Sequence, residues 1–333
     1  NQPVAPAWVP APVGDHVEGL VAAGYTNRMA ALLVRRGVTS PTAAQEFLEP
    51  SLDHLHDPLL MPGLAEGLAR LIQAREDGEK VAIVGDYDVD GVSATALLLA
   101  VFRASGLEAA PILPERLQEG YGFQPIHVEE AVRLGCQLVV TADCGSTALD
   151  AVTRSRESGL DVIVTDHHLG SEVELPAGVV AINPHRPDST YPFPELSGAG
   201  VAYKLSVGLL RALERRVDED ALLRMTCLGT ICDLVPLLGE NRVIAARGVA
   251  SLGSTRSIGL QTLMHKAAVK PPVTATDVGY RIGPRINAAG RLASPRPALD
   301  LLLTSDPAEA RKLANDLDSL NSERQGTERR VVE

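Results

Sequence analysis

The chain has 333 residues, of which 45% are hydrophobic, and this is enough apolar side chain for one large core or two modest ones. No run approaches the ~18 apolar residues of a membrane helix, and no signal-peptide pattern is present, which argues against a membrane-spanning or exported protein. The formal net charge of −11 argues at first against a nucleic-acid partner for the chain as a whole.

The N-terminal segment, residues 1–50, begins Pro-rich and continues with helical patterns, so we expect a helical extension there. Ser40 followed by Pro41 is typical of a helix start, with Ser40 as the N-cap and Pro41 in the first helical position. A further helix is predicted over 59–76.

Five short apolar segments rich in Val and Ile follow, and each ends in a polar residue or a proline: 80–86, 109–114, 137–143, 161–166 and 179–183. Helical patterns over 94–104, 127–134 and 147–158 separate them. This alternation predicts a doubly wound α/β fold with a mostly parallel sheet flanked by helices. Ligands of such sheets bind at the carboxyl ends of the strands, so we expect the acidic residues there to surround one crevice.

The C-terminal part of the chain is predicted to be helical over 197–227 and again over 305–333. Asp306, Pro307 and Glu309 fit a cap, a first-turn proline and a capping-box residue, and the helix that they start is long and mostly polar. Between these helices, residues 241–299 hold nine basic residues against Asp277 alone, so this acidic protein has one basic stretch that can bind phosphates.

Four acidic clusters carry the candidate chemistry, and three of them follow predicted strands: Asp86-Tyr87-Asp88-Val89-Asp90, Asp143, Asp166-His167-His168 and Asp233. Carboxylates at this density raise each other's pKa unless cations neutralise them. Oxygen ligands with one imidazole suit Mn²⁺ or Mg²⁺ better than structural zinc. Two such ions can activate a water for in-line displacement at phosphorus.

Each cluster also has a simpler interpretation. A calcium loop starting at Asp86 is discounted, because its twelfth position is Leu97, within a predicted helix. Taken alone, Asp143 is as well explained as a helix cap as by metal binding, Asp166 could also be a cap, and Asp233 alone is best explained as a buried, hydrogen-bonded acid. The metal interpretation gains its weight from all four clusters together.

The DHH triplet at 166–168, with the upstream DxD and the isolated Asp143 and Asp233, resembles the DHH phosphoesterase superfamily. Further segments resemble the RecJ-type exonucleases within it: residues 33–75, GDYDVDGVSA, INPHRP, SGAGVAYKL, CDLVPLLGENR and GYRIGPRINAAGR. The resemblance spans roughly residues 30–330. It implies two Mn²⁺ or Mg²⁺ ions and five metal ligands: Asp88, Asp90, Asp143, His167 and Asp233.

The resemblance also implies a role for each residue. Asp143 would bridge the two ions, Asp90, His167 and Asp233 would complete one of them, and Asp88 the other. The predicted catalytic group adds His168 as a donor to the scissile phosphate, Asp166 as the residue that orients the histidines, and Asp86 as a supporting group or weak ligand.

Candidate contacts to DNA lie in three further segments. From its residues alone, the segment 283–291 is best explained as a Gly-rich turn with solvated arginines. The resemblance instead implies a loop that approaches the DNA backbone, with donors from Arg281, Arg285, Asn287 and Arg291. Ser197 and Gly198 start a helix that either binds an anion or forms a tight turn without a ligand. His185, with Arg186, is a candidate near the crevice. Tyr121 is a candidate base-stacking residue, whereas Phe123 fits core packing better.

The implied activity is metal-dependent 5′-to-3′ hydrolysis of single-stranded DNA to 5′-mononucleotides, in DNA repair and recombination. Two alternatives remain: a DHH phosphodiesterase for short oligonucleotides or cyclic dinucleotides, and a non-catalytic DNA-binding replication scaffold. Segment 33–75 argues against the first, and the complete ligand set argues against the second.

The expected organisation is a helical extension at 1–50, a DHH phosphoesterase domain at 51–300 and a linker helix at 301–333. The resemblance implies a second domain beyond that helix, with a Gly-Gly-Gly-His loop that this sequence lacks, so we expect a nuclease core without the complete second domain. Four cysteines without a CxxC pair indicate a reduced, cytoplasmic protein. A monomer is favoured, and single-strand binding protein is a partner by resemblance only.

Overall fold

The computed structural model describes residues 16–115, 120–170 and 175–332. The chain divides into two compact units, Asn1–His54 and Leu55–Glu333, and each is described by itself. In the described part of the first unit, three short helices and a 3-10 turn bury Leu20, Leu33 and Ala44: α1 (Val17–Ala22), α2 (Asn27–Val34), α3 (Pro41–Leu48) and η1 (Leu52–His54). Ser40 caps α3 as predicted, because its Oγ accepts the Ala43 N–H at 3.2 Å.

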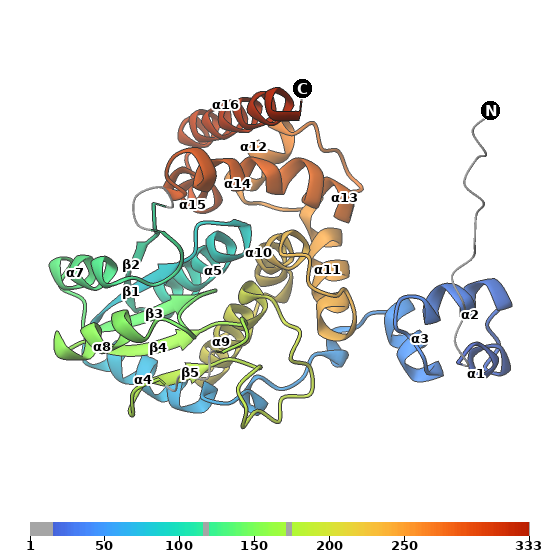
Figure 1. Cartoon of the computed structure of the whole chain (residues 1–333), viewed down its shortest axis with the longest axis horizontal. Helices are drawn as coiled ribbons and strands as arrows, with labels where there is room; N and C mark the ends of the chain where they lie inside the picture. Colours follow the sequence, from blue (N-terminus) through green and yellow to red (C-terminus); the bar gives the residue numbers. More distant parts are fainter. Residues whose placement is uncertain (1–15, 116–119, 171–174, 333) are drawn as a thin grey trace. The chain divides into compact units, whose positions relative to one another are not determined.

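The second unit is built on a parallel sheet, which has five strands in the described residues and the order β2-β1-β3-β4-β5 (Figure 1). The strands are β1 (Lys80–Gly85), β2 (Glu108–Ile112), β3 (Leu138–Ala142), β4 (Asp161–Thr165) and β5 (Val180–Ile182). All five were predicted to within two residues at each end. The doubly wound α/β fold expected from the sequence is therefore confirmed.

Helices cover both faces of this sheet. One face packs against α7 (Pro125–Arg133) and α8 (Leu149–Glu157), and a core cluster there includes Phe123, Val139 and Val164. The other face packs against α4 (Leu64–Glu76), α5 (Val89–Ser105) and α9 (Gly198–Ala212). Burial on both faces explains why the strands are apolar throughout rather than alternating.

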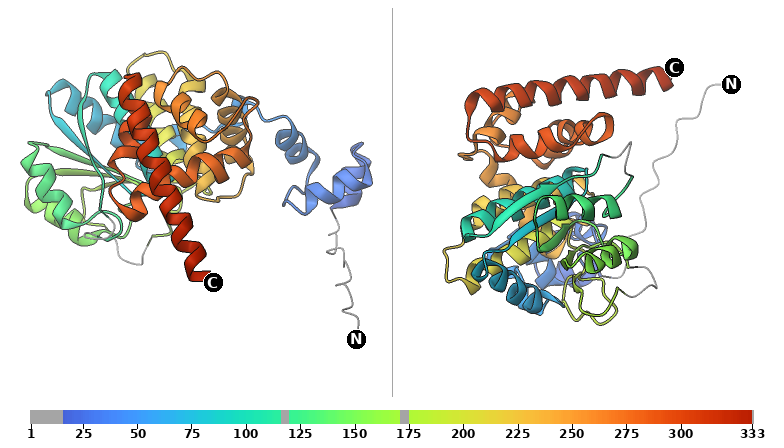
Figure 2. Two further views of the ribbon diagram at one scale, coloured as in Figure 1. Left: turned by 90° about the horizontal axis from the view of Figure 1, so that it is seen from above. Right: turned by 90° about the vertical axis from the view of Figure 1, so that its left-hand side faces the viewer.

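The remaining helices pack on α5 and α9 and on one another, with α16 along the outer side of this group (Figures 1 and 2). They are α10 (Glu219–Cys232), α11 (Gly239–Leu252), α12 (Ile258–Lys266), α13 (Ala275–Asp277), the π-helical turn η3 (Val278–Ile282), α14 (Gly283–Leu292), α15 (Arg296–Leu303) and α16 (Pro307–Val332). The predicted C-terminal helix is confirmed: the Asp306 side chain accepts from Ala308 N at 2.6 Å, and α16 buries a narrow stripe that includes Ala310, Ala314 and Leu317.

Three predicted elements are corrected. The helix expected over 197–227 is two helices, α9 and α10, that are interrupted between Ala212 and Glu219. The helix expected over 59–76 is a 3-10 turn, η2 (Pro58–Leu60), followed by α4. The segment 283–291 is not a loop but lies in α14, where Pro284 occupies the first turn, a position at which its missing N–H costs nothing.

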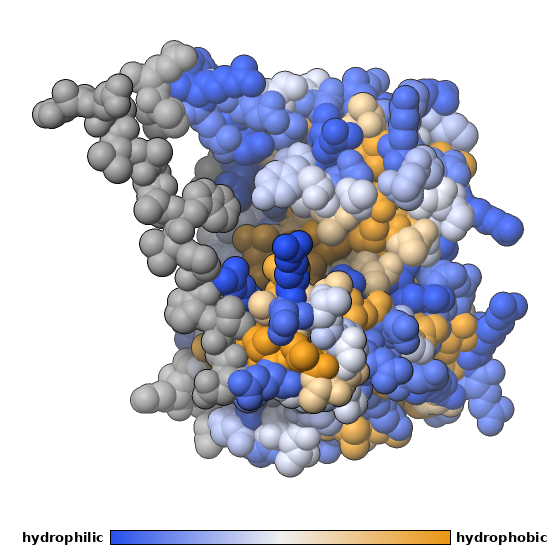
Figure 3. All heavy atoms as spheres, turned by 90° about the vertical axis from the view of Figure 1, so that its right-hand side faces the viewer, coloured by the Kyte–Doolittle hydropathy of each residue, from blue (hydrophilic) through white to orange (hydrophobic). Residues whose placement is uncertain are grey.

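No described helix is both long enough and apolar enough to cross a membrane. On the face drawn in Figure 3, hydrophilic residues surround smaller hydrophobic areas.

Candidate metal centre

Three aspartates continue the hydrogen-bond ladder just beyond the strand ends. The backbone N–H of Asp86 donates to Ala142 O at 3.2 Å, that of Asp143 to Thr165 O at 3.1 Å, and that of Asp166 to Ile182 O at 3.1 Å. The parallel register therefore carries three acids from three strands to one edge of the sheet. All three side chains are buried, at 1–2% exposure.

Asp143 adopts a left-handed backbone conformation, with φ of 64°. This conformation is uncommon for a residue with a Cβ, although Asp and Asn tolerate it best. The helix that follows, α8, has Ala148 at its N-cap and no side-chain cap. The interpretation of Asp143 as a helix cap is therefore wrong, and the strained backbone aims its carboxylate into the crevice instead.

The acidic loop after β1 is ordered by the start of α5. Asp88 is the N-cap, and its Oδ1 accepts the N–H groups of Asp90 at 2.9 Å and Gly91 at 3.0 Å. The Val89 N–H donates to Asn287 Oδ1 of α14 at 3.1 Å. The first three N–H groups of α5 are thus satisfied, and the loop has one defined conformation.

The start of α9 binds the Asp90 carboxylate. Asp90 Oδ2 accepts the Gly198 N–H at 2.6 Å, and Asp90 Oδ1 accepts the Ala199 N–H at 3.0 Å. Ser197 Oγ caps the helix by accepting the Gly200 N–H at 3.2 Å. The anion at this helix start is therefore the protein's own carboxylate. A Cβ on Gly198 would overlap the Asp143 carboxylate, and one on Gly229 of α10 would overlap that of Asp90, so both glycines permit close packing.

The two histidines of the DHH triplet face different partners, as expected. His167 Nε2 lies 3.2 Å from Asp143 Oδ1, 3.6 Å from Asp233 Oδ2 and 3.9 Å from Asp90 Oδ2. A backbone hydrogen bond to Leu196 engages the other side of its ring. This fixes the tautomer and leaves the Nε2 lone pair toward the carboxylates.

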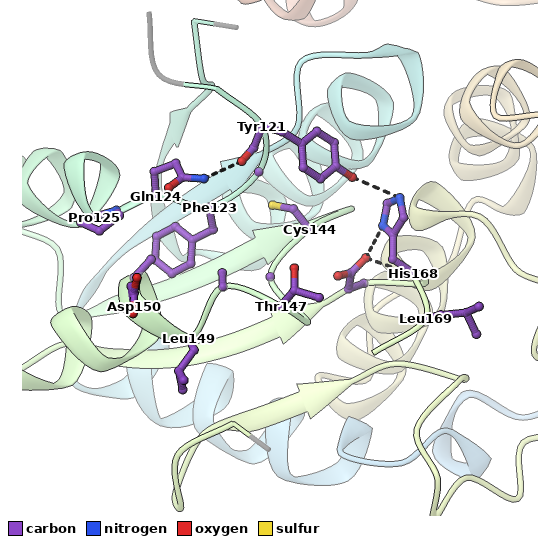
Figure 4. A pocket seen from close by; sticks show the side chains of 15 residues that line it. Tyr121, Phe123, Gln124, Pro125, Cys144, Thr147, Leu149, Asp150, His168 and Leu169 are labelled. Atoms are coloured by element: carbon purple, nitrogen blue, oxygen red, sulfur yellow. Dashed lines mark hydrogen bonds and ion pairs between the residues drawn. The ribbon is translucent and has the colours of Figure 1, made fainter. Parts of the chain in front are cut away.

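His168 is held by Asp166 and by Tyr121. Its Nδ1 lies 2.8 Å from Asp166 Oδ1 and its Nε2 lies 3.1 Å from the Tyr121 hydroxyl, and Figure 4 shows the tyrosine and the imidazole pointing toward one another. Asp166 also accepts the backbone N–H groups of His167, His168 and Ser146 at 2.8–3.1 Å. Both carboxylate oxygens of Asp166 therefore accept hydrogen bonds that orient the DHH triplet and Ser146.

The pKa values around this edge have shifted in the directions that suit a cation site. Burial, with neighbouring Asp88 second, raises the pKa of Asp86 to about 7 and that of Asp233 to about 6. Burial also raises the pKa of Asp90 and Asp143 well above the usual range, with neighbouring carboxylates adding to it. Burial lowers the pKa of His167 to about 4, so the imidazole is neutral at physiological pH.

His168 and Asp166 shift in the opposite sense to these groups. The hydrogen bond to Asp166 raises the pKa of His168 above its usual value. Burial alone would raise the pKa of Asp166, but hydrogen bonds from His168 and the backbone hold it below the usual range. The pair therefore favours an ionised Asp166 beside a charged or strongly polarised His168.

The side chains group into ligand sets of the size that a divalent ion requires. Three sets, each with ligand atoms within 4.8 Å of one another, are Asp90–His167–Asp233, Asp86–Asp88–Asp143 and Asp143–His167–His168. Ligands at right angles around an ion with bonds of 2.0–2.1 Å lie about 3 Å apart, close to the His167–Asp143 separation. Asp143 and His167 each lie in two of the sets.

Three buried atoms at this place have no hydrogen-bond partner among the described residues: Asp86 Oδ1, Asp143 Oδ1 and His167 Nε2. When the carboxylates are ionised, all three are acceptors, because the neutral imidazole also turns its lone pair inward. Acceptors that face one another without a donor are costly unless a cation lies between them. The residues present therefore fit divalent metal ions.

A cavity of about 430 Å³ adjoins this centre between the starts of α7 and α8 (Figure 4). Tyr121, His168, Gly145 and Leu149 are among the residues that line it. Tyr121 is half-exposed and Phe123 is buried in the core, which agrees with the core-packing interpretation of Phe123.

The predicted DNA-contact residues of the basic stretch are not all free. Arg285 of α14 forms an ion pair with Asp318 of α16, with Nε and Nη2 at 2.9 and 2.8 Å from Oδ1. Arg281 is half-exposed but lies 3.3 Å from Asp277. Asn287 accepts from Val89, whereas Arg291 is exposed and has no ion pair within the described part of the chain.

The segment after β5 supports the triplet. Asn183 Nδ2 donates to Ser146 Oγ and to His168 O, both at 2.9 Å, and its Oδ1 accepts the His185 N–H at 2.8 Å. Arg186 pairs with Asp188 at 2.6 Å and donates to Ala181 O. Sequence reasoning did not single out Asn183, although a polar residue directly after a buried strand was the same signal that identified the aspartates.

Comparison with known proteins places the chain in a family. The model of the "DHH family, N-terminal domain" matches residues 80–230. The single-stranded-DNA-specific exonuclease RecJ of Bacillus subtilis (strain 168) is 39% identical over 301 residues, which is 90% of this chain and 38% of that protein.

Two solved structures are similar across most of the chain. A crystal structure of exonuclease RecJ bound to manganese has 36% sequence identity and a TM-score of 0.76, over 84% of this chain and 70% of the other. RecJ of Thermus thermophilus in complex with Mn²⁺ has 33% identity and a TM-score of 0.79, over 96% of this chain and 46% of the other.

The chain spans between 38% and 54% of the length of the curated RecJ relatives that it matches. These relatives match about 90% of this chain, and this chain covers 70% of the RecJ structure bound to manganese at 36% identity. The chain therefore belongs to the DHH family, in its RecJ branch.

Proposed function

We propose that this chain is the nuclease core of an exonuclease that hydrolyses single-stranded DNA from the 5′ end to 5′-mononucleotides, in DNA repair and recombination in the bacterial cytoplasm. Its relatives of similar sequence bear the name single-stranded-DNA-specific exonuclease, and two of the similar structures are described as bound to manganese. In this proposal, α16 leads from the core toward a second, substrate-gripping domain.

The observation that carries the proposal is a pair of neighbouring ligand sets, Asp90–His167–Asp233 and Asp86–Asp88–Asp143, which the 3.2 Å approach of His167 Nε2 to Asp143 Oδ1 links. Asp90, His167 and Asp233 would hold one ion, Asp88 with Asp86 the other, and Asp143 both. Two divalent ions in this place would supply activation of the attacking water and charge neutralisation on both oxygens of an in-line displacement at phosphorus. The buried, unpartnered Asp86 Oδ1, Asp143 Oδ1 and His167 Nε2 support this assignment.

The chain's own residues would orient the substrate around these ions. His168 is half-exposed, and Asp166 directs its ring so that Nε2 faces the cavity side and Tyr121. From there it would donate a hydrogen bond to an oxygen of the scissile phosphate. Arg281, Arg291 and the Arg285 guanidinium, if it leaves Asp318, are proposed contacts to the DNA backbone.

A direct assay tests the activity. We expect the chain with Mn²⁺ to shorten 5′-phosphorylated, 3′-labelled single-stranded DNA while the label stays on the shrinking fragments, and EDTA to stop the reaction. Early release of a labelled mononucleotide would contradict the proposed polarity. Preference for a dinucleotide over a long single strand would favour a phosphodiesterase for short oligonucleotides. Tight Mn²⁺ binding without any cleavage would show that the metal centre is real and that the core needs the second domain to hold DNA.

The raised carboxylate pKa values predict how Mn²⁺ stabilises the fold at different pH. In the metal-free protein, Asp86 and Asp233 titrate near 7 and 6, above the ~4 of an unfolded chain, so the folded state binds more protons in between. The free energy of unfolding of the metal-free protein should therefore fall as the pH rises from about 4 to about 7.

Mn²⁺ should remove this penalty, because the ions neutralise the carboxylates that repel one another. We expect the rise in melting temperature caused by Mn²⁺, relative to EDTA, to increase between about pH 5 and pH 8 in differential scanning fluorimetry. An Mn²⁺-induced shift of equal size throughout this range would show that these carboxylates do not bind the ion.

A further inference from the structure

Helix α14 contacts the acidic loop at two points, although about 200 residues separate them in the sequence. Asn287 Oδ1 accepts the Val89 N–H at 3.1 Å. One turn further along α14, Gly290 lies so close to the carbonyl oxygen of Tyr87 that a Cβ there would overlap it. The two contacts are made by Tyr87 and Val89, the residues on either side of Asp88. The backbone that carries this acid therefore packs directly against α14.

Val89 is the first residue of α5 and lies between two of the proposed metal ligands, Asp88 and Asp90. The N–H groups of the next two residues are satisfied by Asp88 Oδ1, which cannot also reach the Val89 N–H in the N-cap geometry. Asn287 therefore supplies the acceptor that completes this helix start. Without it, the Val89 N–H would be unpaired in a partly buried place, and the peptide between the two ligands would be free to rotate toward water.

On its other side, α14 is braced against the C-terminal helix. Asp318 of α16 accepts from Arg285 at 2.8–2.9 Å and also pairs with Lys266 at 3.4 Å. Ile286, Ala288 and Ala289 are fully buried, so packing holds α14 in one position. A side chain that projects from a braced helix is suited to positioning another group, because its own location is overdetermined.

We propose that Asn287 is a positioning residue that sets the geometry of the Asp88–Asp90 loop for metal binding, rather than a contact to DNA. The inference rests on the proposed metal-dependent function. It assigns to Asn287 the part that hydrogen-bonded neighbours of metal ligands play elsewhere, where their loss lowers metal affinity without removing a ligand.

Substitution of Asn287 tests this with Mn²⁺ alone, in the absence of DNA. Asn287→Ala and Asn287→Leu remove the acceptor with different volumes, and Asn287→Asp keeps it. We expect the first two to raise the Mn²⁺ dissociation constant about 10- to 100-fold in isothermal titration calorimetry, and the Asp variant to bind within a few-fold of the parent. The matched control is Ser257→Ala, which removes the cap of α12 at Leu260 N and should leave Mn²⁺ affinity unchanged.

Two readouts separate positioning from DNA contact and from misfolding. Amide hydrogen exchange in EDTA should show faster exchange at Val89 in the Ala and Leu variants, with parental protection in the sheet. If these variants bind Mn²⁺ like the parent and only KM for single-stranded DNA rises, Asn287 contacts DNA and the proposal is overturned. If the Asp variant loses affinity as the Ala variant does, the Oδ1 acceptor is not what matters, which also overturns it.

Failure of the proposed function would look different. In that case the parent itself would show no Mn²⁺ binding, and Asp143→Asn would make no difference to the titration. The exchange rate at Val89 would still decide whether Asn287 orders the loop, because that measurement is made on the metal-free protein.

Discussion

Replacing Asp143 with Asn is expected to lower the rate of single-strand cleavage by at least about 10³-fold. Rate losses of this size are typical when one member of a catalytic centre whose groups act as a unit is removed. Asp143 forms one ligand set with Asp86 and Asp88, and its Oδ1 also lies 3.2 Å from His167 Nε2 of the other set, so its loss affects both proposed ions at once. An amide in its place has one oxygen and no charge, so it cannot bridge two cations as a carboxylate does.

Asn is the right substitution because the backbone at 143 has φ of 64°, and Asn tolerates this conformation about as well as Asp. Ala there would add backbone strain, and any loss of activity would be difficult to attribute. The carboxamide also has nearly the volume of the carboxylate, so the close approach of Gly198 to this side chain is preserved.

The same variant should be more stable than the parent in EDTA. Burial and neighbouring acids disfavour a charge at Asp143, and removing it relieves that repulsion. We therefore expect a higher melting temperature together with lost cleavage, the pattern of a site in which function is kept at the expense of stability. Asp77→Asn, at the exposed end of α4, is the matched control and should change neither quantity. Near-parental cleavage by Asp143→Asn would refute the two-ion arrangement.

The position of the centre could be predicted because strand ends are local signals. Asp86, Asp143 and Asp166 each follow a short apolar run, and parallel topology then brings them to one edge of the sheet. Their partners could not be predicted in the same way. Asp90 is bound by the start of α9 across 108 residues, and no local pattern distinguishes a helix start that binds a side chain from one that binds a ligand.

In the basic stretch, residues 241–299, the partners of the charged side chains could not be predicted from the sequence either. Gly283, Pro284 and Gly290 read as loop residues, yet Pro284 lies in the first turn of a helix and Gly290 allows that helix to touch Tyr87. The positive charge of Arg285 is directed to Asp318, which only the packing of α14 on α16 brings near. Composition identifies a basic segment, but the tertiary structure decides which of its charges remain available to phosphate.

Glu240→Ala is expected to lower the free energy of unfolding of the second unit by about 3–5 kcal/mol, the cost of leaving one partner of a buried ion pair alone. Lys204 of α9 and Glu240 of α11 form an ion pair with both side chains at most 1% exposed. Glu240 also accepts the Tyr191 hydroxyl at 2.6 Å and the His56 N–H at 2.8 Å. Burial already lowers the pKa of Lys204, so without its partner this ammonium would be strongly destabilised.

The free energy of unfolding is measured by urea denaturation for three variants: Glu240→Ala, Lys204→Met and the double variant Lys204→Met with Glu240→Leu. If the loss arises from an uncompensated charge, the double variant should recover much of the stability lost in Glu240→Ala, because it leaves no ion behind. The exposed pair Arg154–Glu157, at 3.8 Å, supplies the control Glu157→Ala, for which we expect a change of about 0.5 kcal/mol or less. Equal destabilisation in the single and double variants would instead assign the effect to the packing of α9. This helix also begins with the Ser197–Gly198 turn that binds Asp90.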